Sequence, residues 1–130
     1  MKATEDLIGQ FEKHLIPSES FHHSDHVRLA FCYLSEYPVL DALGRFSNSL
    51  NAFATSLGKP ERYHETITYA YFFLIRERMA RTPVESWDDF ARRNPDLLQW
   101  KDGILTRFYC KETLESDLAR FVFLLPDKCR

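Results

Sequence analysis

Residues 61–80, with the sequence ERYHETITYAYFFLIRERMA, carry the strongest helical pattern of the chain and decide its fold class. Apolar positions recur along this stretch at steps of three and four residues, which is the spacing of one face of an amphipathic helix. The row consists of Ile67, Ala70, Tyr71, Leu74 and the aliphatic stem of Arg78. Thr82 and Pro83 follow and stop the pattern. We therefore predict a helix here that buries one face in the core.

The rest of the chain repeats this type of pattern, and it has only four glycines with which to build hairpins. The further predicted helices are Thr4 (as N-cap) to Leu15, a helix that starts between Ser20 and Ser24 and ends before Pro38, Val39–Leu57 closed by Gly58, 84–93, 96–100, and 104 to at least Ala119. The run FVFLL at 121–125 fits either a helix end or an extended segment. We predict an all-α, single-domain bundle of about six to seven helices over residues 1–130.

The charge and composition of the chain limit which classes of binding partner are expected. Seventeen basic and nineteen acidic residues give a net charge of -2, so no overall positive field attracts nucleic acid. No stretch approaches the roughly 18 apolar residues of a membrane span, and the first residues lack the apolar core of a secretory signal. Cys32, Cys110 and Cys129 are scattered without CxxC spacing, which disfavours a disulfide framework or a thiolate zinc site. We expect a cytoplasmic protein, and the oligomeric state stays open.

Residues 21–30, FHHSDHVRLA, hold three of the five histidines. His64 lies on the same helix face as the apolar row that starts at Ile67, one step before it. His23 lies in the same way before the apolar row of the preceding predicted helix, and His26 is beside it. The three imidazoles would then face one interior and share a divalent ion, for which zinc, iron, nickel and copper are equally suitable. Glu65 is a candidate fourth ligand or a general base for a metal-bound water, and thus the predicted catalytic residue.

Each of these residues also has a structural interpretation. A histidine on an apolar face is commonly a core residue satisfied by a hydrogen bond, and we favour that interpretation or a capping role for His14 and His22. Thr68, four residues after His64, is placed to orient that ring or to meet a ligand, and Tyr71 is the best candidate for the wall of a substrate pocket. Thr66 is interpreted as bonded back to the carbonyls of its own helix.

The motifs F-x-H-x-x-H-V-x-x-A-x-x-Y-L (21–34), Y-H-E-T-I-T (63–68) and S-x-x-A-R…P-D (116–127) resemble a family of small, uncharacterised bacterial helical proteins. The resemblance implies that His23, His26 and His64 with Glu65 form a recurrent polar set. It also makes Arg120 a candidate to bind a carboxylate, either Glu65 or an anionic ligand. A looser similarity to the HD-domain phosphohydrolases breaks down where those enzymes have a His-Asp pair, because this chain has His-Glu.

Three functional hypotheses follow. The first is a metal-dependent enzyme that acts on a small organic molecule through His23, His26 and His64. The second is a non-enzymatic module, either a small-molecule-binding domain or a metal-stabilised interaction domain. The third is a metal-free helical protein whose histidines are only hydrogen-bonded. No glycine-rich phosphate loop or Ser or Cys nucleophile motif occurs, which disfavours nucleotide-cofactor enzymes and covalent hydrolases.

Overall fold

Helices make up the regular structure of residues 2–128, which are the residues that the computed structural model describes, with side chains from residue 6 onward. The longer ones are α1 (Lys2–Glu12), α2 (His23–Glu36), α3 (Val39–Ser56), α4 (Glu65–Arg81) and α5 (Trp87–Arg93). The shorter ones are α6 (Pro95–Leu98), α7 (Lys111–Leu114), α8 (Asp117–Phe121) and the 3-10 turns η1 (Ser18–Ser20), η2 (Pro60–Arg62) and η3 (Ile104–Arg107). No strand occurs within 2–128, so the predicted all-α class is confirmed.

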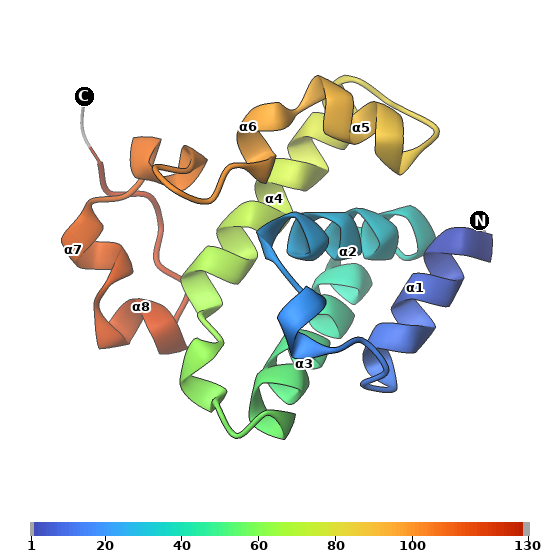
Figure 1. The fold of residues 1–130 in the computed structure, drawn as a ribbon. Helices are drawn as coiled ribbons and strands as arrows, with labels where there is room; N and C mark the ends of the chain where they lie inside the picture. The colour runs from blue at the N-terminus through green and yellow to red at the C-terminus, as the bar shows by residue number, and fades with distance from the viewer. Residues whose placement is uncertain (1, 129–130) are drawn as a thin grey trace.

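Helix α4 is the central element of the bundle. Figure 1 shows it, in light green, between α1, α2 and α3 on one side and α7 and α8 on the other, with α5 and α6 near its C-terminal end. Tyr71, Phe72 and Ile75 of α4 are buried in the core, and Ile67 and Leu74 pack against it half-buried. Each fully buried side chain of this size stabilises the fold by about 1.5–3 kcal/mol relative to its exposed state. The predicted apolar face therefore does anchor the fold.

Two predicted helix starts are wrong, for local reasons. Helix α4 begins at Glu65, because the backbone of His64 is extended and its ring accepts the hydrogen bond of the Ile67 N–H. Thr4, predicted as an N-cap, lies inside α1. The predicted end of α3 is confirmed, because Gly58 follows it with a φ of 70°, a left-handed conformation that glycine adopts at no steric cost.

The C-terminal region differs most from its prediction. The continuous helix expected from residue 104 is instead divided into η3, α7 and α8, and the chain after Phe121 is extended. Thr66, fully buried on α4, donates its hydroxyl to the Val122 carbonyl at 2.9 Å and accepts the Leu124 N–H at 3.1 Å. The prediction that Thr66 bonds back to its own helix is thus wrong. Its hydroxyl instead holds the extended segment against α4 through these two hydrogen bonds.

Arg78 ties α4 to the α5–α6 region. Its guanidinium donates to both carboxylate oxygens of Asp96, at 2.8 and 3.1 Å, and to Asn94 Oδ1 at 2.8 Å. The buried Asn94 side chain in turn donates to the Phe90 carbonyl at 2.9 Å. A planar guanidinium suits this forked arrangement, and it fixes the position of α6.

Within residues 2–128 there is no helix with the length and apolar character needed to cross a bilayer. Cys32 is buried, as predicted for a core residue, and Cys110 is half-buried with a free thiol. Cys129 lies outside the described residues.

Candidate functional site

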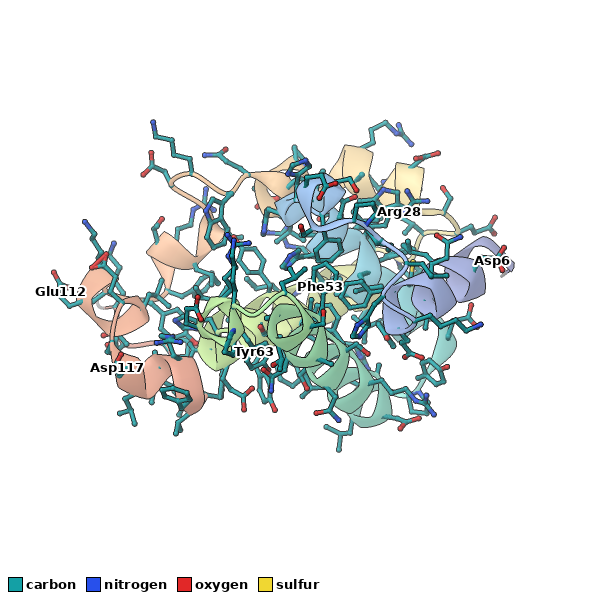
Figure 2. All side chains as sticks on the ribbon, turned by 60° about the horizontal axis from the view of Figure 1, so that its bottom comes forward. Asp6, Arg28, Phe53, Tyr63, Glu112 and Asp117 are labelled. Carbon is teal, nitrogen blue, oxygen red and sulfur yellow. The ribbon has the colours of Figure 1, made fainter. Side chains whose placement is uncertain are left out.

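A cavity of about 520 Å³ lies where α2, α3 and α4 meet η1 and η2. Most of its wall is apolar or aromatic, with Phe21, Val27, Phe46, Leu50, Phe53, Ala54, Leu57, Tyr63, Ile67, Tyr71, Ile75 and Trp100. Figure 2 shows Phe53 and Tyr63 toward the middle of the molecule, whereas Asp6, Glu112 and Asp117 lie near its edges. The polar part of the wall is Ser18, His22, His23, His26, Glu61, Arg62, His64, Thr68 and Arg120. The volume is typical of a site for a small organic molecule.

His64 faces this cavity from the start of α4, and both of its ring nitrogens are already hydrogen-bonded. Nδ1 accepts from the Ile67 N–H at 3.1 Å, and Nε2 donates to the Leu114 carbonyl at 2.7 Å. The ring is therefore neutral, with its proton on Nε2. Burial lowers its pKa, an effect that the bond to Leu114 opposes and the positive charge of Arg120 reinforces.

His23, the first residue of α2, forms a similar bond from the other side of the cavity. Its Nε2 lies 2.9 Å from the Leu97 carbonyl, to which it donates. Its ring contacts the rings of Tyr71 and Trp100, with centroids 4.8 and 5.1 Å away. Burial lowers the pKa of His23, and the bond to Leu97 partly opposes that shift. His23 thus connects α2 to α6, the helix that Arg78 positions.

His26 differs from the other two, because its ring nitrogens have no hydrogen-bond partner among the described residues. The ring packs against that of Phe21 with centroids 4.4 Å apart, and the exposed side chain lines the cavity. Desolvation by the surrounding protein has the largest effect on the pKa of His26 and lowers it. The charge of His23 lowers this pKa further, and the Asp25 carboxylate raises it. A neutral imidazole offers one N–H donor and one acceptor nitrogen to a molecule in the cavity.

The structure brings His23, His26 and His64 to one cavity but does not form the predicted metal site. Among residues 2–128, no group of three or more His, Cys, Asp or Glu side chains is arranged to hold a metal ion. The physical reason lies in the hydrogen bonds, because His64 has no free ring nitrogen and His23 has only Nδ1 left. Ligation by all three rings would require breaking the cap of α4 or the bond to Leu114.

Glu65 does not line the cavity. Its Oε1 accepts a 2.5 Å hydrogen bond from the Tyr63 hydroxyl, and burial together with this bond raises the pKa of Tyr63. As the first residue of α4, Glu65 also complements the positive end of the helix dipole. The geometry therefore gives it a local structural role and does not support the predicted role of metal ligand or general base.

The three predicted substrate-binding residues, Thr68, Tyr71 and Arg120, all line the cavity. Thr68 is half-buried, and its hydroxyl bonds to no other described residue, so it is available to a ligand. Arg120 does not reach Glu65, because its Nη2 donates to the Glu61 carbonyl at 3.0 Å. Glu61 and Arg62, both in η2, also line the cavity.

Sequence reasoning missed several wall residues. Leu50, Phe53 and Leu57 belong to the predicted helix Val39–Leu57, and an apolar helix face gives no signal that part of it lines a cavity. Arg62 lies in the 3-10 turn η2 and Trp100 in an irregular segment, and their positions depend on tertiary contacts. A local pattern does not encode such positions.

No protein-family model matches this chain, and neither a curated protein nor a solved structure matches it. The resemblance of its motifs to a bacterial family therefore stays a prediction. The candidate site rests on geometry and chemistry alone.

Proposed function

We propose that this protein binds a small organic molecule with a largely apolar body in the cavity between α2, α3 and α4. The cavity has about 520 Å³, within the range of roughly 300–1,000 Å³ that is typical of small-molecule sites. Its wall combines aromatic and aliphatic side chains with a few polar groups. Such a wall binds an apolar body by removing it from water, and the polar groups fix its orientation.

The observation that carries this proposal is the unpaired ring of His26. His23 and His64 use Nε2 to hold neighbouring segments, whereas the His26 ring packs against Phe21 and forms no hydrogen bond with another described residue. On a convex surface, a histidine without a protein hydrogen bond would be ordinary, because water satisfies its ring nitrogens. A histidine on the wall of a mostly apolar cavity is instead placed to give a ligand one directional polar contact.

The metal-dependent reaction predicted from the sequence is not carried into this proposal. It needs at least three converging ligands, and His64 is fully hydrogen-bonded. The non-enzymatic small-molecule-binding alternative needs only the cavity and its polar contacts. Of the hypotheses raised from the sequence, it is the one that the geometry supports best.

The proposal is tested by calorimetric titration with 1-naphthylacetamide, a neutral aromatic probe small enough for the cavity. The wild-type chain is expected to bind it, and Thr68→Trp is expected to abolish binding because the indole fills the cavity from α4. Arg76→Trp is the matched control, because Arg76 lies on the exposed side of the same helix and does not line the cavity.

His26→Phe tests the polar contact separately. Phenylalanine retains an aromatic ring in contact with Phe21 and removes both ring nitrogens, so binding is expected to weaken about tenfold, which corresponds to the loss of one hydrogen bond of about 1.4 kcal/mol. Absence of binding to the wild type up to the solubility limit, both by 1-naphthylacetamide and by 1-naphthylacetate with the same ring, or equal binding by Thr68→Trp and Arg76→Trp, would refute the proposed function.

A further inference from the structure

We propose that the natural ligand of this cavity is an organic monoanion, a carboxylate on an apolar body, whose charged group binds at Arg62 and Arg120. This inference rests on the proposed function and adds the chemical class of the ligand. It comes from the charges on the cavity wall and from the hydrogen bonds that the two arginines leave unused.

The charged side chains of the wall are two arginines, Arg62 and Arg120, and one acid, Glu61. The four histidines of the wall, His22, His23, His26 and His64, are counted as neutral, as they are in the net charge of the whole chain. The wall therefore carries a net charge of +1, from two positive charges and one negative charge, in a chain whose net charge is -2. A local charge opposite in sign to that of the whole chain favours an anionic ligand at this place.

Arg120 is held in position by one hydrogen bond, and other N–H groups of its guanidinium remain available. One nitrogen, Nη2, donates to the Glu61 carbonyl at 3.0 Å, and Nη1 lies 3.9 Å from a carboxylate oxygen of Asp117. The Asp117 side chain is 92% exposed, so this pair is weak and screened by water. A guanidinium has five N–H donors, and most of those of Arg120 have no protein acceptor within residues 2–128.

Arg62 follows Glu61 directly, so the bond from Arg120 to the Glu61 carbonyl brings both arginines to one edge of the cavity. The Arg62 side chain forms no hydrogen bond or ion pair with another described residue. No salt bridge joins Glu61 to either arginine within the described part of the chain. Arg62, which has no ion pair with another described residue, and Arg120, whose ion pair with Asp117 is long and exposed, therefore lie together on the wall of an apolar cavity.

The rest of the cavity wall favours an apolar body for the ligand. Beyond the arginines the cavity is lined mainly by aromatic and aliphatic side chains, which solvate a hydrocarbon body and reject a multiply charged one. Two arginines opposed by one acid leave one positive charge to neutralise. A planar carboxylate also matches the fork of a guanidinium, which binds it through two parallel hydrogen bonds.

The test compares 1-naphthylacetate with 1-naphthylacetamide, which share the same ring and differ in charge. Titration at pH 8 and low ionic strength keeps the histidines neutral and the arginine field unscreened. The acid is expected to bind at least about tenfold more tightly than the amide. Arg62→Gln and Arg120→Gln are each expected to remove most of this preference, because the affinity for the acid falls more than the affinity for the amide.

Arg76→Gln is the control, because it removes the same charge from an exposed position outside the cavity. Circular dichroism confirms folding, and Arg62, whose side chain bonds to no other described residue, supplies a variant that retains the fold if Arg120→Gln does not. Equal affinity for acid and amide would overturn this inference and leave the proposed function standing. A similar loss in Arg76→Gln and Arg62→Gln would also overturn it, because net charge alone would explain the preference. Failure of both probes to bind overturns the proposed function, and this inference with it.

Discussion

The Nε2 atom of His64 lies 2.7 Å from the carbonyl oxygen of Leu114, a residue 50 positions later in the chain. The same ring caps α4 through Nδ1, so one neutral imidazole both starts the central helix and holds the last residue of α7. His23 makes the equivalent bond to Leu97 in α6. Two of the three histidines that suggested a metal site from the sequence, His23 and His64, therefore link the long helices α2 and α4 to the short C-terminal ones.

Replacing His64 separates its two structural roles. His64→Asn keeps a good N-cap acceptor but is too short to reach Leu114, whereas His64→Ala loses both bonds. We expect Asn to lower the free energy of unfolding by about 1 kcal/mol and Ala by about 2 kcal/mol, measured by urea denaturation at pH 7.5. Equal losses for the two variants would show that the cap does not contribute.

The histidines also predict how stability depends on pH. In the folded chain the pKa values of His23, His26 and His64 lie below their ordinary value of 6.5. The unfolded chain therefore binds more protons as the pH falls, so the stability contributed by the neutral rings is complete above pH 6.5 and is lost as the pH falls through the folded pKa values. We expect the urea midpoint to be level from pH 8 to 7 and to fall from pH 6.5 to 5.

The carboxyls of Asp96 and Asp127 do not explain a change in that window, because hydrogen bonds with Arg78 and with Thr113, respectively, lower their pKa values from 3.8. His64→Asn serves as the control, since it removes one titrating ring and retains the cap. Its midpoint should fall less steeply between pH 6.5 and 5 than that of the wild type. An identical slope would show that His64 does not contribute to the dependence.

Thr66→Val tests the link between α4 and the extended C-terminal segment. Valine has nearly the same shape, but it leaves the Val122 carbonyl and the Leu124 N–H without their partner. We expect a loss of about 1–3 kcal/mol and faster amide hydrogen exchange over residues 122–128. Thr66→Ser retains the hydroxyl and should retain slow exchange there. Fast exchange in both variants would mean that the lost methyl group, not the hydroxyl, controls the segment.

Arg78→Lys tests whether α6 positions His23. Lysine keeps the charge but lacks the fork that reaches both oxygens of Asp96 and Asn94 Oδ1. We expect a loss of about 1 kcal/mol, because the pair is partly exposed, with side-chain exposures of 30% and 36%. In a double-mutant cycle with His23→Ala, the two changes should be non-additive. Strict additivity would show that α6 holds its place without Arg78.

Metal analysis tests the three-histidine hypothesis directly. Protein purified without a histidine tag and equilibrated with zinc should retain no stoichiometric metal after gel filtration, because the ring nitrogens of His64 are occupied. His23→Ala and His64→Ala should match the wild type. One zinc ion per chain, lost in both variants, would restore the hypothesis and require the bonds to Leu97 and Leu114 to open.

The sequence predicted the long elements well because their signals are local. The apolar rows of α2, α3 and α4 and the stop at Gly58 depend on spacing and backbone preference, and both are confirmed. The division of residues 104–121 into three short pieces was missed, because this region makes contacts with distant residues such as His64, which bonds to the Leu114 carbonyl. Apolar spacing alone does not reveal such contacts.

The candidate site was predicted in composition but not in chemistry. Extending two apolar rows placed His23 and His64 on a common cavity, and the structure brings them there. The sequence could not indicate that the carbonyls of Leu97 and Leu114 would take up their Nε2 atoms. Backbone acceptors are present at every position, so only the fold determines which of them a histidine meets.

The cavity wall draws on the chain from Ser18 to Arg120, and the bonds that brace it end at Leu97 and Leu114. During synthesis, the cavity is therefore completed only after Arg120 has left the ribosome. A molecule that binds there distinguishes chains folded as far as Arg120 from shorter ones, and at a hundred times its Kd it would stabilise them by about 2.7 kcal/mol. Occupancy of the cavity would thus report the conformational quality of residues 18–120.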